Sequence, residues 1–199
     1  MKKAFLVSIF FFSFVVCGHA GERIYHGKVI DADTREPIEG AVVVAYWVEK
    51  MATPAGATSR LKEVKEELTD KNGEWSIVGE EQEKNPDYEK SWRTKTYFTY
   101  HPIFIIFKPG YCSFPKGFSI EACKGKMKPR GAADIAGGKD VELPKIVNLE
   151  DRIRVKPAPI GEKENWPKQR NFIHLIREEW RFLYSKDPGD LYKIQENPK

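Results

Sequence analysis

The hydrophobic positions of this chain fall in short runs that end in turn-forming residues, a pattern typical of β-strands. The segment Ile24–Asp31 alternates between two faces, one of which carries Tyr25, Gly27 and Val29. Ala41–Val48 is rich in β-branched and aromatic residues, and Ile103–Phe107 is continuously apolar before a Lys-Pro-Gly turn. We therefore expect strands over all three segments, with Ile103–Phe107 as a central strand.

A turn signal at Thr69–Gly73 contains an Asn-Gly pair, which tolerates positive φ and favours tight hairpins. It predicts that Glu66–Thr69 pairs with Glu74–Val78. That pairing would place Trp75 and Ile77 together on the core side of the second strand.

The remaining segments of the first 150 residues carry weaker patterns. Met51–Ser59 is small and flexible and predicts a loop, whereas Gly79–Arg93 is charged and irregular. Thr94–Tyr100 alternates weakly, as an edge strand does, and Val141–Leu149 supplies a last strand. This part of the chain is therefore expected to be mainly β.

The tail has a helical period instead. Apolar residues recur at spacings of three, one, four and three, at Phe172, Leu175, Ile176, Trp180 and Leu183. Asn165 is placed to cap this helix with Pro167 in its first turn, and Pro188-Gly189 ends it. Such a helix either packs on the domain or binds a partner or a membrane surface, and we favour packing.

The first twenty residues have the pattern of a secretory signal peptide. Two lysines precede the apolar run Ala4–Val16, and small residues at the −3 and −1 positions favour cleavage after Ala20. A membrane anchor needs roughly 20 apolar residues, more than this run contains. Lipidation of Cys17 is the less favoured alternative, because a bulky valine precedes it. We expect a periplasmic or secreted protein.

Charge limits the classes of partner. Without the signal peptide and its two lysines, 31 Lys and Arg stand against 29 Asp and Glu, a net charge of +2. This balance does not favour nucleic acid or an anionic membrane as a partner. No second apolar run is long enough to span a bilayer, so no membrane span is expected in the mature form.

Two cysteines remain in the mature chain, Cys112 and Cys123. In an exported protein such a pair predicts a disulfide, which stabilises a loop of this length by about 2–3 kcal/mol. A thiol metal site would need more soft ligands than these two residues provide.

Three phrases of the sequence together resemble a known family. GKVIDADTREPIEGAVVVA (Gly27–Ala45), TDKNGEWSI (Thr69–Ile77) and IIFKPGY (Ile105–Tyr111) are similar to the pattern of the carboxypeptidase regulatory-like domain. The resemblance covers roughly Arg23–Leu149 and implies a transthyretin-like, or prealbumin-like, fold of about seven strands in two sheets. It implies no activity, since members of the family are accessory modules or free-standing exported proteins.

The residues themselves form no convincing catalytic or metal-binding set. Asp31, Asp33, Asp70 and Asn72 lie in turns but lack the spacing of a calcium loop. Three histidines remain in the mature chain: His26, His101 and His174. They match no zinc motif, and no nucleophile elbow of the G-x-S-x-G type is present. We therefore expect no catalytic residue, no metal and no cofactor.

An aromatic stretch supplies the candidate binding surface, formed by Trp92, Tyr97 and Tyr100. Exposed Trp and Tyr side chains favour interfaces, and their rings can stack on sugars or peptide side chains. The alternative, which we favour, is an edge strand covered by the C-terminal helix.

These patterns predict a signal peptide over residues 1–20, a β-sandwich domain over 23–150, and a linker and packed helix over 151–199. The expected fold is mainly β, an antiparallel seven-stranded transthyretin-like β-sandwich with a C-terminal amphipathic helix. The expected function is a non-catalytic exported module with a binding or structural role in the bacterial cell envelope, for an unknown protein or carbohydrate partner. Two alternatives stay open: a metal-dependent enzyme similar to intradiol dioxygenases, and an adhesin or envelope-complex subunit.

Overall fold

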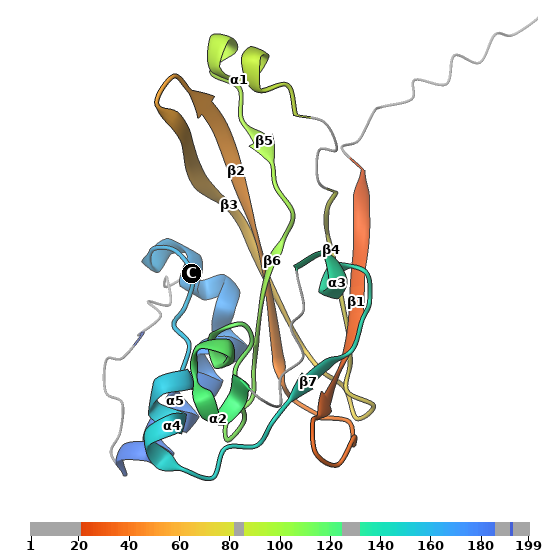
Figure 1. Ribbon diagram of the computed structural model, residues 1–199, viewed down its shortest axis with the longest axis vertical. Coiled ribbons are helices and arrows are strands. Elements are labelled where there is room, and N and C mark those ends of the chain that lie inside the picture. The colour runs from red at the N-terminus through yellow and green to blue at the C-terminus, as the bar shows by residue number, and fades with distance from the viewer. Residues whose placement is uncertain (1–20, 82–85, 125–131, 186–191, 193–199) are drawn as a thin grey trace, which may run out of the picture.

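The computed structural model describes residues 21–81, 86–124, 132–185 and 192. The predicted signal peptide, with Cys17, lies outside the described residues. The strands of the described chain form two sheets, as the sequence predicts (Figure 1). No helix within these ranges is long and apolar enough to cross a membrane.

The smaller sheet has three strands in the order β4-β1-β7. β1 (Glu22–Asp31) pairs antiparallel with β4 (Glu74–Glu80) and parallel with β7 (Val141–Leu143). The parallel pair departs from the purely antiparallel arrangement that was expected. β7 is also shorter than the expected strand to Leu149, because Pro144 follows and has no N–H to donate.

The larger sheet is built on β2 (Val42–Thr53), which pairs on one side with β3 (Gly56–Leu68). On its other side it pairs with β5 (Phe98–Thr99) and β6 (Ile103–Phe107). Among the described strands, β6 makes its ladder with β2 alone. β6 is therefore an edge strand, although its continuous apolar run predicted a central one.

Two turns differ from their predictions. Met51–Ser59, predicted as a loop, is part of a hairpin in which β2 and β3 pair as far as Thr53 and Gly56. The Asn-Gly turn at Thr69–Gly73, predicted as a hairpin, connects β3 of the larger sheet to β4 of the smaller one. Since β3 pairs with β2 and β4 pairs with β1, the predicted pairing across this turn is wrong.

One hydrophobic core is shared by the two sheets. The smaller sheet contributes the buried side chains of Tyr25, Val29, Trp75, Ile77, Val141 and Leu143. The larger sheet contributes Val43, Ala45, Trp47, Phe104 and Ile106. The ring of Tyr25 packs edge-on against Trp47, with centroids 5.9 Å apart. The core-side positions predicted for Trp75 and Ile77 are therefore confirmed, and the face of β1 that carries Tyr25 and Val29 is the one that points into the core.

Short helices between the strands were not predicted. They are α1 (Tyr88–Thr94), η1 (Lys116–Ser119), α2 (Glu121–Lys124), α3 (Ala132–Ala136), α4 (Leu149–Val155) and η2 (Lys163–Gln169). The charged stretch before residue 93 concealed α1, although Asp87 is a good helix cap. Its carboxylate accepts the N–H of Lys90 at 2.8 Å.

The predicted amphipathic helix is present as α5 (Arg170–Tyr184) and packs on the outer face of the larger sheet (Figure 1). Its buried side chains Phe172, Leu175 and Ile176 form a second core with outward residues of β2, β3 and β6. The rings of Phe172 and Phe107 meet edge to face at 6.3 Å. This second core fixes the helix to the sheet.

The start of α5 differs from its prediction. Residues 163–169 form the 3-10 helix η2, and Asn165 does not cap α5. Instead the carboxylate of Glu66, on β3, accepts the N–H groups of Asn171 and Phe172 at 2.8 and 2.9 Å. Burial under the helix raises the pKa of Glu66 in spite of these two donors. A strand residue far along the sequence thus supplies the cap.

Candidate functional site

Asp31, in the first of the three sequence phrases, is a structural residue. Asp31 is buried, and its Oδ1 accepts the N–H groups of Asp33 and Thr34 at 2.9 and 3.0 Å. Its Oδ2 accepts the hydroxyl of Tyr111 at 3.2 Å and lies 3.7 Å from Nζ of Lys145. Burial alone would raise the pKa of Asp31, but these four groups outweigh it and the pKa is lowered. The carboxylate is therefore charged and fully engaged.

The second phrase is tied to the first by buried hydrogen bonds. Oγ1 of Thr69 accepts the N–H of Ala41 at 2.8 Å and donates to the carbonyl of Ile38 at 2.6 Å. The carbonyl of Gly73 accepts the N–H of Val29 at 2.8 Å. Gly73 has a φ of +74°, and a Cβ there would lie 2.4 Å from the Val29 carbonyl oxygen. Glycine is required at this turn.

The candidate metal and acid–base residues are dispersed. Within the described ranges, no three His, Cys, Asp or Glu side chains are grouped so that they could hold a metal ion. His26 points outward from β1, His101 precedes Pro102, and His174 on α5 lies 3.2 Å from Glu178. No pair of these histidines shares an element.

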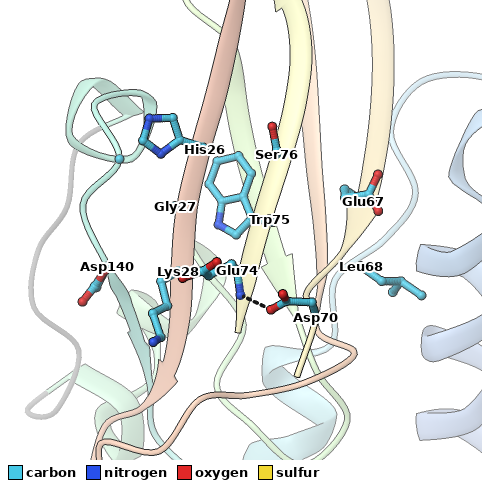
Figure 2. Close-up of a pocket in the computed structure, with 11 residues that line it drawn as sticks. His26, Gly27, Lys28, Glu67, Leu68, Asp70, Glu74, Trp75, Ser76 and Asp140 are labelled. Carbon is cyan, nitrogen blue, oxygen red and sulfur yellow. Dashed lines mark hydrogen bonds between the residues drawn. The ribbon is translucent and has the colours of Figure 1, made fainter. Parts of the chain in front are cut away.

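A polar groove of about 650 Å³ opens on the outside of the smaller sheet (Figure 2). Its floor comes from outward positions of β1 and β4, where His26 lies opposite Ser76 and Lys28 opposite Glu74. Glu67 of β3 and Asp140, just before β7, complete its rim. Because the groove carries both positive and negative side chains, it suits a ligand that also carries both positive and negative groups.

Trp75 borders the same groove between β1 and β4 (Figure 2). Its indole packs against Gly27, where a Cβ would lie only 3.0 Å from the ring. The ring is buried, and its N–H has no hydrogen-bond partner among the described residues. Gly27, in the first sequence phrase, therefore makes room for Trp75, in the second.

An apolar groove of about 510 Å³ lies on the outside of the larger sheet. Ile103 and Ile105 of β6 form one wall, and Phe114 and Pro157 contribute others. Tyr46 of β2 is half-buried there, and burial raises the pKa of its phenol. This groove differs from the first in having an apolar lining.

The disulfide supports a wall of this second groove. The sulfurs of Cys112 and Cys123 lie 2.08 Å apart, at bonding distance, as the sequence predicts. Both cysteines are buried, and the segment between them contains Phe114 and the helix η1. The bond holds that segment against the edge of β6, where Phe114 bridges to Ile106.

The predicted aromatic surface is not a single platform. Arg60 stacks over Tyr97 at 4.1 Å, and Lys50 stacks over Tyr100 at 3.9 Å. Trp92 is 45% exposed on α1. Lys50 and Arg60 therefore cover two of the three predicted rings, and Trp92 is the most exposed of the three. The binding role of this surface stays a prediction.

The expected cover for this surface does not form. α5 packs at the other end of the larger sheet from α1 and β5 (Figure 1). Its Trp180 lies against Tyr184, with ring centroids 4.3 Å apart, and under the ammonium of Lys156. The interpretation that the C-terminal helix covers the aromatic stretch is therefore wrong.

The two grooves were missed by sequence reasoning. Outward positions such as His26 and Lys28 follow from the alternation of β1, but their cross-strand partners depend on which strands pair. The mistaken hairpin assigned β4 to β3, so Ser76 and Glu74 were not placed beside β1. No local pattern brings Pro157 to β6, since the linker position depends on how α5 packs.

The chain matches no protein-family model, and no curated protein matches it. One solved structure is similar, that of catechol 1,2-dioxygenase from Acinetobacter sp. ADP1 inhibited by bound mercury, with 14% identity and a TM-score of 0.33. The match covers 74% of this chain and 59% of that enzyme's chain. A similarity of this size establishes neither a shared fold nor a shared activity.

Proposed function

We propose that this protein is an exported, non-catalytic binding module of the bacterial cell envelope. Its domain would be a transthyretin-like β-sandwich of the carboxypeptidase regulatory-like kind. The three sequence phrases and the two mostly antiparallel sheets support the fold. The disulfide between Cys112 and Cys123 supports export, because such bonds persist in oxidising compartments.

A contrast between two groups of polar residues supports the binding role. The polar atoms of Asp31 and Thr69 are engaged in buried hydrogen bonds within the fold. In the polar groove, His26, Glu74 and Ser76 are exposed on an open face of the smaller sheet. Groups that are fixed inside stabilise the protein, whereas groups that line an open groove are available to a partner. We infer that the groove binds a protein segment carrying both charges.

Site-specific photocrosslinking in cells tests this proposal. Ser76→p-benzoylphenylalanine places the probe in the groove, and Thr58→p-benzoylphenylalanine places it on the exposed β2–β3 hairpin as a matched control. We expect a discrete adduct with one partner from the groove position and none from the hairpin. Absence of an adduct from Ser76, in a variant with the wild-type melting temperature, would contradict the proposal.

Metal analysis separates the binding role from the enzyme alternative. The purified mature protein is expected to contain no stoichiometric transition metal after expression in metal-supplemented medium. One equivalent of iron or zinc that survives dialysis would favour a metal-dependent enzyme. This experiment measures the number of metal equivalents bound per protein, so it can be done without knowing a substrate.

A further inference from the structure

The apolar groove on the larger sheet has the form of a small-molecule site. It is a separate hollow from the polar groove, lined by different residues on the other sheet. Its volume of about 510 Å³ lies within the range of ligand pockets. Ile103 and Ile105 offer it an uninterrupted aliphatic wall. The body of a ligand that fits here is apolar.

The polar groups of this groove are few, and one of them is cationic. Tyr46, Lys116 and Ser119 are its polar side chains, and no carboxylate is among the described residues that line it. Nζ of Lys116 donates to the carbonyl of Lys156 at 2.7 Å, which holds the ammonium beside Pro157. Two of its three N–H donors remain for another acceptor. Lys116 is exposed, so the charge lies at the mouth of the groove.

A second ammonium lies near the first. Lys156 is partly buried against Trp180, with its Nζ 3.9 Å from the ring centroid. Burial lowers the pKa of Lys156, and the positive charge of Lys116 lowers it further. The carboxylate of Glu179 partly offsets this lowering of the Lys156 pKa, but both of its oxygens accept hydrogen bonds from Arg152. Lys156 does not itself line the groove, so among the described lining residues Lys116 supplies the charge, and that charge is positive.

We propose that this groove binds a single-chain anionic amphiphile, a free fatty acid carboxylate, with its chain along Ile103 and Ile105 and its head group at Lys116. Charge complementarity selects the anionic head group, and the apolar lining selects the chain. This site does not depend on the partner proposed for the polar groove. If the apolar groove binds no fatty acid, the crosslinking expected from Ser76 is unaffected.

Calorimetric titration with dodecanoate, below the concentration at which it forms micelles, tests the site on the mature protein. We expect saturable binding of one equivalent. Decanoate, shorter by two methylenes, should bind about fifteenfold more weakly, because each buried methylene contributes about fourfold in affinity. Dodecyltrimethylammonium, with the same chain and a cationic head, should bind at least tenfold more weakly than dodecanoate.

Variants locate the binding. Lys116→Met should weaken dodecanoate about tenfold, whereas Lys71→Met, the same change on a distant exposed turn, should leave it unchanged. Ala158→Trp, at an exposed position in the lining, should abolish binding without changing the melting temperature. Ser119→Trp, at another exposed position in the lining, replaces Ala158→Trp in this experiment if Ala158→Trp lowers the melting temperature.

Four results would overturn the proposal. The first is the absence of saturable dodecanoate binding to the wild-type protein, and the second is equal affinity for dodecanoate and dodecyltrimethylammonium. The third is an equal effect of Lys116→Met and Lys71→Met on dodecanoate binding. The fourth is flotation with phosphatidylglycerol vesicles that Ala158→Trp abolishes, which would assign the groove to a bilayer surface.

Discussion

The hydroxyl of Tyr111 donates a hydrogen bond to the carboxylate of Asp31 at 3.2 Å, across 80 residues of sequence. The other oxygen of that carboxylate holds the turn that follows β1. The tyrosine ends the third sequence phrase and the aspartate belongs to the first. This contact therefore links the first and third phrases in the folded protein, at the turn that follows β1.

Removing the hydroxyl should destabilise the protein. Tyr111→Phe leaves the ring in place but deprives Asp31 of one hydrogen bond. We expect the free energy of unfolding to fall by about 1 kcal/mol, as measured by urea denaturation at neutral pH. Tyr184→Phe, at an exposed position on α5, is the matched control and should have no effect. Equal stability of the two variants would show that the Asp31 contact contributes nothing.

The same carboxylate should make stability depend on pH. Its pKa is lowered in the folded protein, so its contribution is present above the pKa of the unfolded chain and is lost as the pH falls through the folded pKa. Asp31→Asn removes the charge. We expect it to cost about 1–2 kcal/mol at pH 7, and the difference from wild type should narrow progressively in acid. A difference that is constant or grows in acid, in urea titrations over this range, would contradict the shift.

Trp47 and Gly79 should be strongly coupled. A Cβ on Gly79 would lie 2.0 Å from Cζ2 of Trp47, whose indole N–H also donates to the carbonyl of Glu80 at 3.0 Å. Gly79→Ala should therefore cost about 2–3 kcal/mol through overpacking. In a Trp47→Leu background the same alanine should cost much less, and a double-mutant cycle measures the difference. Additive effects would mean that the ring and the glycine do not interact.

A buried ion pair joins α4 to α5. Arg152 binds Glu179 through two hydrogen bonds of 2.7 and 2.5 Å, with the glutamate side chain only 3% exposed. Arg152→Met would leave this carboxylate buried without its partner, at a cost of about 3–5 kcal/mol. The double variant Arg152→Met/Glu179→Leu should be more stable than the single one. Arg93→Met, which breaks an exposed pair with Glu89, should change stability by less than about 1 kcal/mol. Similar losses for Arg93→Met and Arg152→Met would argue against a buried pair.

Local sequence signals predicted most of the strands and the C-terminal helix, but they did not predict the short helices or all of the connections. The alternation of β1 correctly placed Tyr25 and Val29 on one face, which the structure buries, and the period of the tail correctly predicted α5. The Asn-Gly turn was misread because a tight turn fixes only the local change of direction. Whether the next strand stays in the same sheet depends on competition for hydrogen bonds with β1, which lies far away in sequence.

The candidate site was less accessible to sequence reasoning. Aromatic residues near Trp92 stood out by composition, yet Lys50 and Arg60 cover Tyr100 and Tyr97 from strands distant in the chain. The polar groove arises from registered pairs such as His26 with Ser76, which only the sheet order reveals. Both cases depend on pairing between strands, which no single segment specifies.

The central claim is that the residues that stabilise the fold and those that bind a partner are different. Crosslinking yield from Ser76→p-benzoylphenylalanine, measured together with unfolding free energy in two backgrounds, tests it most directly. We predict that Tyr111→Phe lowers stability but keeps the adduct, whereas Lys28→Gln/Glu74→Gln keeps stability but loses the adduct. Loss of the adduct in Tyr111→Phe, or its retention in Lys28→Gln/Glu74→Gln, would contradict the claim.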